Sequence, residues 1–271
     1  MNFYDSEKKE FVEINDNFIY QYANAYFYSV NQPQPKPFIK GLHRSSYYPE
    51  KEIERILKDG IKTPEDVVHI LAWKIGKIKH LKCTNESAFK YSDDWKNLKY
   101  DNKGKLNNNT VKLRSTTLEI KAISEYVSDA DNLAKWKEMV NSGNWFEVLK
   151  DLQEKKWSGL GTVYCITLLY FISGGEYPIF DQFVDKALDA ICEQKCKFPN
   201  ANKNYIPLQS ELPKKDSYLE KFKIRYTNYC ENINKIKCQL SEEYRDPKNR
   251  DLDRALWVYG HLKCADCFNK Q

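Results

Sequence analysis

The sequence predicts an all-α protein, a two-lobed helical bundle with at most a small β-ribbon. Apolar residues recur at three- and four-residue steps along much of the chain, as they do in amphipathic helices. Caps and helix breakers stand where such helices would begin and end. No stretch alternates apolar and polar residues for long enough to build a sheet of several strands, and no internal repeat is visible.

The length of the chain allows one large core or two modest ones. No Pro-, Gly- or Ser-rich linker divides the 271 residues, so we expect residues 1–271 to form a single compact, two-lobed helical protein. The stretch 84–113 contains an Asn triplet and an Asp-Asn-Lys-Gly sequence, which are typical of turns. It predicts an irregular basic loop or a small ribbon.

Helix boundaries are clearest in the first third of the chain. One helix is expected to open at Tyr47-Tyr48-Pro49-Glu50 and to close at Gly60. The next begins with Thr63 as its N-cap and Pro64 in its first position. It carries His69, which we expect to be a packed or partly exposed side chain and not a ligand. Further helices are expected over residues 115–127, 131–141, 217–240 and 251–263.

Two helices joined by a glycine turn form the centre of the chain. An apolar stripe predicts a helix over 144–155, and Gly159 and Gly161 then provide a tight turn in which a positive φ and a close approach are tolerated. The following residues, 163–172, are apolar on nearly every side, which suits a helix inside a bundle. The unpaired N–H groups at its start, together with the helix dipole, favour an anion such as phosphate.

A carboxylate opens the next helix. Gly174-Gly175 ends the buried helix, and a new apolar stripe begins directly after Asp181. Asp181 is therefore predicted to stand at a helix N-terminus. Its simplest role is that of an N-cap, for which Asp is strongly preferred, and a catalytic role is compatible with it.

These residues resemble a known family. The run Trp157–Leu188 is similar to the helix-hairpin-helix DNA glycosylase superfamily (HhH-GPD), whose hallmark is a Leu-Pro-Gly-(Val/Ile)-Gly hairpin, an apolar helix and an aspartate that opens the next helix. Asp181 follows Gly159 by 22 positions, the separation in endonuclease III-like members. The sequences Gly-Leu-Gly-Thr and Tyr-Pro-Ile-Phe-Asp also resemble bacterial proteins with an 8-oxoguanine DNA glycosylase fold. About thirty-two of the 271 residues carry this resemblance.

The resemblance implies excision of a base from DNA. In that family the target nucleotide is flipped out of the helix into a pocket, at a lower cost when the base is damaged or mispaired. Asp181 matches the family's catalytic aspartate, which would stabilise the cationic sugar and help to position the nucleophile. The residues implied or expected to contact DNA phosphate are Gly159, Gly161, Thr162, Val163, Lys155 and Lys156.

The chain departs from the family pattern at two positions. Bifunctional members carry a lysine two residues after the second hairpin glycine, where this chain has Val163. We therefore expect a monofunctional, water-using glycosylase or a protein that has lost catalysis. Lys155, Lys156 and Lys186 are nearby in sequence and could supply an amine, although phosphate contact or solvation is their expected role. Ser158 replaces the usual hairpin proline.

Positive charge is concentrated in one stretch. The chain has 43 Lys and Arg residues against 38 Asp and Glu residues, a net charge of +5. Between Lys74 and Arg114 the basic residues number eleven and the acidic residues four. Such lysines can follow a phosphate backbone, and aromatic side chains between them can stack on bases; an ordinary solvated, lysine-rich surface is the alternative. These aromatic residues are Phe89, Tyr91, Trp95 and Tyr100.

The eight cysteines are expected to be reduced. The N-terminus lacks a basic segment followed by an apolar one, so we expect a cytoplasmic protein. The late cysteines do not match the C-x6-C-x2-C-x5-C pattern of the family's iron–sulfur members, and no metal or other cofactor is expected. A zinc site is the alternative, and its ligands would be Cys192, Cys196, Cys264 and Cys267.

Three functions are compatible with the sequence. The leading expectation is an enzyme, a DNA glycosylase acting on a damaged or modified base of double-stranded DNA as a monomer, without a membrane partner. A non-catalytic helix-hairpin-helix module that uses Asp181 only as a cap is the second. The third is a helical interaction protein in which the glycine pair is simply a tight turn and DNA is not bound.

Overall fold

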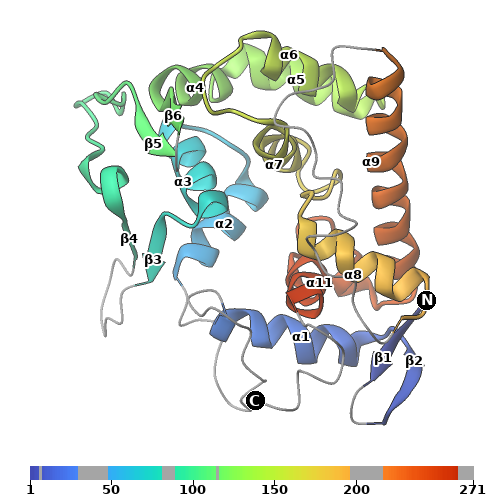
Figure 1. Ribbon diagram of the computed structural model, residues 1–271. Coiled ribbons are helices and arrows are strands. Elements are labelled where there is room, and N and C mark those ends of the chain that lie inside the picture. The colour runs from blue at the N-terminus through green and yellow to red at the C-terminus, as the bar shows by residue number, and fades with distance from the viewer. Residues whose placement is uncertain (6–7, 30–47, 81–88, 114–115, 196–215, 262–271) are drawn as a thin grey trace. The chain divides into compact units, whose positions relative to one another are not determined.

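Helices dominate the protein. The computed structural model describes residues 1–5, 8–29, 48–80, 89–113, 116–195 and 216–261, and eleven α-helices lie in these ranges (Figure 1). The all-α prediction is therefore confirmed. The described strands pair as three antiparallel two-stranded sheets, which is more than the one small ribbon that the sequence predicts.

The chain folds into two compact units. The first consists of Met1–Arg44, Ile179–Leu208 and Lys215–Gln271. The second consists of Ser45–Pro178 and Gln209–Lys214. The chain enters the second unit after Arg44 and returns to the first at Ile179, so Asp181 lies just after that return.

The first unit contains helices from the N-terminal and the C-terminal parts of the chain. Helix α1 packs on α11, and α11 packs on α8. The rings of Phe3, Phe18, Tyr22 and Tyr259 form its aromatic core, with centroids 4.8–6.2 Å apart. The elements are β1 (Asn2–Asp5), β2 (Glu10–Glu13), α1 (Asp16–Ser29), α8 (Gln182–Cys192), α9 (Asp216–Lys237), α10 (Glu242–Arg245) and α11 (Asp251–His261).

The second unit is built around α7. This helix contacts α3, α5 and α6, and its residues from Cys165 to Ile172 are all buried, as the apolar sequence predicts. The elements are α2 (Tyr48–Asp59), α3 (Pro64–Ile75), β3 (Ile78–His80), β4 (Phe89–Tyr91), the 3-10 helix η2 (Asp93–Asn97), β5 (Val111–Leu113), β6 (Thr116–Leu118), α4 (Ile120–Val127), α5 (Ala130–Asn141), α6 (Trp145–Glu154) and α7 (Thr162–Ile172).

The structure corrects two sequence predictions, one about a helix start and one about an aromatic side chain of the basic stretch. The helix expected over 115–127 begins only at Ile120, because Thr116–Leu118 form β6 and pair with β5. Trp95 does not offer a ring for base stacking: its side chain is fully buried, and its indole N–H donates to the Lys112 carbonyl at 3.3 Å. His69 is buried, as predicted.

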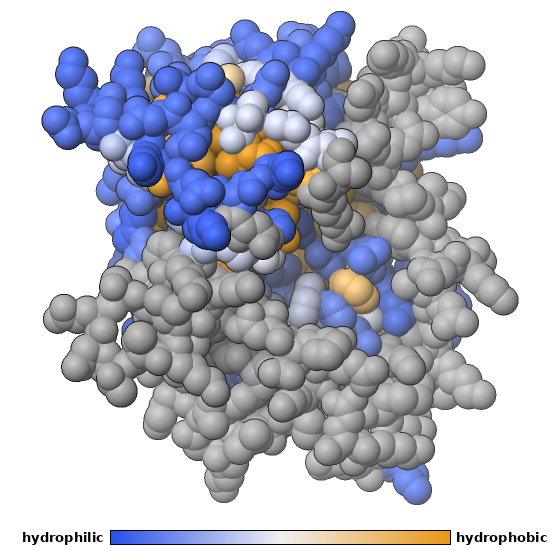
Figure 2. Space-filling view, turned by 60° about the vertical axis from the view of Figure 1, so that its left-hand side comes forward, coloured by the Kyte–Doolittle hydropathy of each residue, from blue (hydrophilic) through white to orange (hydrophobic). Residues whose placement is uncertain are grey.

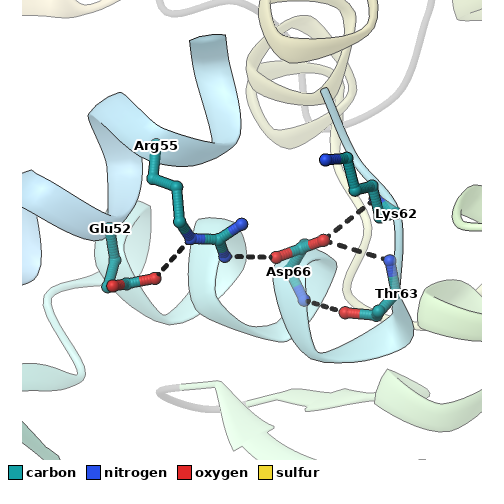
Figure 3. Close-up of polar contacts among 5 residues, drawn as sticks. All are labelled: Glu52, Arg55, Lys62, Thr63 and Asp66. Atoms are coloured by element: carbon teal, nitrogen blue, oxygen red, sulfur yellow. Dashed lines mark hydrogen bonds and ion pairs between the residues drawn. The ribbon is translucent and has the colours of Figure 1, made fainter. Parts of the chain in front are cut away.

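The start of α3 is fixed by the predicted cap (Figure 3). The Thr63 hydroxyl accepts a hydrogen bond from the Asp66 N–H, and the Asp66 carboxylate accepts from the Thr63 N–H in return, which completes a capping box. The same carboxylate accepts from the Lys62 N–H at 2.9 Å and from the Arg55 guanidinium at 2.7 Å. Asp66 therefore joins α2 to α3 as well as capping α3.

None of the helices in the described part of the chain is long and apolar enough to cross a lipid bilayer.

Asp66→Ala should destabilise the second unit by about 2–3 kcal/mol, because two backbone donors lose their acceptor and Arg55 loses a nearly buried partner. The midpoint of urea unfolding, followed by circular dichroism, measures this loss. Glu52→Ala is the control: it removes the more exposed ion pair with Arg55 and should cost less than about 1 kcal/mol. Equal losses in the two variants would contradict the role given to Asp66.

Candidate functional site

The predicted glycine hairpin is present in the second unit. Helix α6 ends at Glu154 and α7 begins at Thr162, so the helix–turn–helix arrangement is confirmed. Lys156 (φ 52°) and Gly159 (φ 79°) adopt left-handed backbone conformations within the turn. Across it, the Gln153 side-chain amide donates to the Thr162 hydroxyl at 3.1 Å and links the two helices.

Gly159 is required by packing within the chain. A Cβ at this position would lie 2.9 Å from the carbonyl oxygen of Thr117 and 3.3 Å from the Cα of Leu118, both in β6. Together with the positive φ, this contact leaves room only for glycine. The close approach that the sequence predicts is therefore made to the protein's own backbone, and it holds the hairpin against β6.

Gly161 has a different role. Its φ of −80° and ψ of 170° are open to any residue, so the positive φ that the turn was expected to tolerate occurs at Gly159 and not at Gly161. Gly161 is the N-cap of α7 and provides no capping side chain. In the described part of the chain, no acceptor meets the N–H of Thr162 or of Val163. These two groups and the helix dipole suit an anion.

Two lysines lie where α6 ends and the turn begins. Lys155 and Lys156 are both exposed. The Lys155 ammonium lies 4.7 Å from the ring centroid of Tyr126, a cation–π contact that limits where it can point. The hairpin thus combines donor groups with two positive charges that water can reach.

Asp181 lies in the first unit, where it is the N-cap of α8. Its Oδ1 accepts a hydrogen bond from the Phe183 N–H at 2.9 Å, so the predicted N-cap role is confirmed. The side chain is half-buried. One turn further on, Asp185 pairs with Arg225 at 2.7 Å, and burial raises the pKa of Asp185 despite this partner, with the charge of Asp181 adding to the effect.

Helix α11 meets the start of α8 beside Asp181. A Cβ at Gly260 would overlap the carbonyl group of Phe183, so the two backbones touch. The His261 ring stacks on the Phe183 ring with 3.4 Å between centroids, and the Trp257 ring lies 3.7 Å from His261 on the same helix. This contact was not predicted from the sequence. Its one local signal is a glycine inside an otherwise helical pattern.

The His261 imidazole has a defined tautomer. Its Nδ1 lies 2.8 Å from the Trp257 carbonyl oxygen, which can only accept, so Nδ1 carries the proton and Nε2 is the acceptor of the neutral ring. Burial lowers the pKa of His261, while the charge of Asp181 raises it and that of Lys186 lowers it. Burial also lowers the pKa of Lys186. The surroundings of Asp181 therefore include an imidazole and a half-buried amine, and burial lowers the pKa of both.

The predicted site residues fall into both units. Lys155, Lys156, Gly159, Gly161, Thr162 and Val163 come together on the hairpin of the second unit, and Asp181 belongs to the first. Of the alternative zinc ligands, Cys192 is described and exposed, whereas Cys196, Cys264 and Cys267 lie outside the described residues. The described residues contain no group of three or more His, Cys, Asp or Glu side chains that could hold a metal ion.

No protein-family model, curated protein or solved structure matches this chain.

Gly260→Ala should destabilise the first unit by about 1–3 kcal/mol, because the added methyl group has to push α11 away from α8. The midpoint of thermal unfolding measures the loss. Gly104→Ala, in the second unit, is a comparison variant without a steric clash: its added Cβ meets open space, and only its positive φ opposes the change, at a cost of about 1 kcal/mol. A Gly260→Ala variant with the wild-type midpoint would contradict the close contact.

Proposed function

We propose that this protein is a monofunctional DNA glycosylase, which binds duplex DNA through the hairpin and hydrolyses the N-glycosidic bond of a damaged or modified base. The observation that carries the proposal is the order of three elements: two helices joined by a glycine turn, a buried apolar helix, and a carboxylate at the N-cap of the next helix. This is the arrangement that the helix-hairpin-helix glycosylases share.

The hairpin supports the DNA-binding part of the proposal. A phosphate oxygen placed at the start of α7 would accept from the N–H groups of Thr162 and Val163, which have no other acceptor among the described residues. The exposed Lys155 and Lys156 would add positive charge at the same place. Such contacts position a duplex without reading its sequence.

Asp181 supports the catalytic part. As the bond between C1′ and the base nitrogen breaks, the sugar becomes an oxocarbenium ion, which a preorganised carboxylate stabilises. The Phe183 N–H holds one carboxylate oxygen in place. The carboxylate then takes a proton from the water that attacks C1′, while the departing base is protonated by solvent. Val163 has no amine, so no Schiff base is expected at that position.

One observation favours a second candidate. The N-cap contact accounts for Asp181 without any catalysis, as a non-catalytic DNA-binding module would require. The two candidates agree on DNA binding and differ on excision. Binding and excision therefore have to be measured separately.

Gly161→Asp should weaken duplex binding at least tenfold and leave the thermal unfolding midpoint unchanged or slightly higher. An aspartate suits the backbone conformation of this N-cap, but its charge would occupy the phosphate position. Gly161→Ser is the matched control, because it adds a cap without a charge and should bind more tightly than the Asp variant. Fluorescence anisotropy with a labelled duplex measures both. Equal affinities for the two variants would argue against an anion at this turn.

Asp181→Asn should abolish base excision and keep duplex binding within about threefold of the wild type, since the amide can still cap α8. The assay uses labelled duplexes with 8-oxoguanine, uracil, alkylated purines or mismatches, followed by cleavage with and without alkali. Alkali-dependent cleavage by the wild type alone is the expected result. Binding without cleavage of any substrate would instead favour the non-catalytic module.

Borohydride treatment during the reaction tests the monofunctional assignment. No covalent protein–DNA adduct is expected. An adduct that forms with the wild type and is absent in Lys186→Gln would identify Lys186, whose pKa burial lowers, as a nucleophile and would replace hydrolysis by a lyase mechanism.

A further inference from the structure

We propose that a lysine ribbon in the second unit forms a second phosphate-binding surface, which continues from the hairpin and binds the backbone of the same duplex. The inference rests on the proposed function, because both surfaces take duplex DNA. The lysine ribbon consists of the described residues 93–113 and 116–118, from η2 to β6, and the exposed basic residues among them are Lys96, Lys99, Lys103, Lys105 and Lys112.

The strand register places Lys112 on the outer side of the ribbon. Lys112 in β5 pairs with Thr117 in β6, and both residues are exposed. Their neighbours Val111, Leu113 and Leu118 are buried. Because side chains alternate along a strand, the Lys112–Thr117 pair faces away from the core.

The same pair connects the ribbon to the hairpin. The Thr117 carbonyl is the atom that a Cβ at Gly159 would meet first, at 2.9 Å. Thr117 therefore lies between the two: it pairs with Lys112 in β5 and packs against Gly159 in the hairpin.

The remaining lysines are carried by an ordered loop. Asp101 accepts hydrogen bonds from the N–H groups of Lys105 and Lys103, and these bonds lower the pKa of its carboxyl group. A β-bridge between Tyr100 and Leu106 closes the turn. The indole of Trp95 ties η2 to β5 through the Lys112 carbonyl. The ribbon therefore holds its charges on a structured backbone.

Charge and aromatic placement identify the partner as a duplex. The five exposed lysines outnumber the exposed acids Asp94 and Asp101 on the described segment. Trp95 and the hydroxyl groups of Tyr91 and Tyr100 are buried, so these aromatic groups point inward. A surface for single-stranded DNA would instead present rings for base stacking.

The surface view (Figure 2) shows the polarity of the side of the protein that carries β3 to β6. Figure 2 brings forward the side of Figure 1 that carries β3 to β6, and hydrophilic residues cover much of its coloured surface. A group of apolar residues is visible between them. The coloured part of this face (Figure 2) is therefore polar around an apolar group.

The salt dependence of binding tests the ribbon. In the full-length protein, Lys99, Lys105 and Lys112 are replaced together by alanine, and the affinity for an undamaged labelled duplex is measured over a range of salt concentrations. The slope of log K against log salt should become shallower by about 0.9 for each phosphate that the variant no longer neutralises, or by roughly 2–3 in all. Affinity at low salt should fall at least tenfold.

A matched triple variant separates this effect from net charge. Lys51, Lys58 and Lys137 are exposed lysines on α2 and α5 of the same unit, and replacing them by alanine removes the same total charge. This control should keep a slope within about 0.5 of the wild type. Thermal unfolding verifies that both triple variants are folded.

Three other results would contradict the ribbon, the choice of duplex DNA as partner, or the proposed function. A ribbon variant with the wild-type slope, alongside weaker binding by Gly161→Asp, would overturn the ribbon and leave the hairpin proposal intact. Tighter wild-type binding to single-stranded DNA than to the duplex would overturn the choice of partner. A wild-type protein that binds no duplex at all would overturn the proposed function together with this inference.

Discussion

The contact between Gly159 and the backbone of β6 determines how the hairpin is built. It excludes any side chain at Gly159, fixes the turn that leads into α7, and brings the Lys112–Thr117 pair next to that turn. The hairpin and the ribbon are therefore parts of one packed structure. This contact accounts for Gly159 by packing alone, so Gly159 is not evidence for DNA binding. The proposed phosphate site therefore depends on Gly161 and on the charges around it.

Local signals made much of the fold predictable. The Thr63 cap, the buried helix α7 and the Asp181 cap were all predicted because their patterns depend on neighbours within about one helical turn. The strands β1, β2, β3 and β6 were not predicted. Each has only three or four residues, too few for a clear alternation, and their pairing is formed in three dimensions. Helix α1 was missed although its buried residues Phe18, Ile19, Tyr22 and Ala23 do follow a helical period.

In the candidate site too, features set by neighbouring residues could be predicted from the sequence, and features set by distant residues could not. The position of Asp181 at a helix start follows from its own neighbours, whereas its contact region with Gly260 and His261 joins residues about eighty positions apart. For Trp95 the sequence predicted a feature that the structure does not have. A tryptophan among lysines suggests a stacking surface, but composition does not tell on which side of the backbone a ring lies, and this one fills the core.

Affinity and selectivity would come from different parts of this protein. The hairpin and the lysine ribbon would contact phosphates, which every sequence presents alike, so they would supply binding strength and orientation only. Selection of a base would then depend on residues beside Asp181. The rings of Phe183, Trp257 and His261 are partly exposed there, at the junction that Gly260 makes possible.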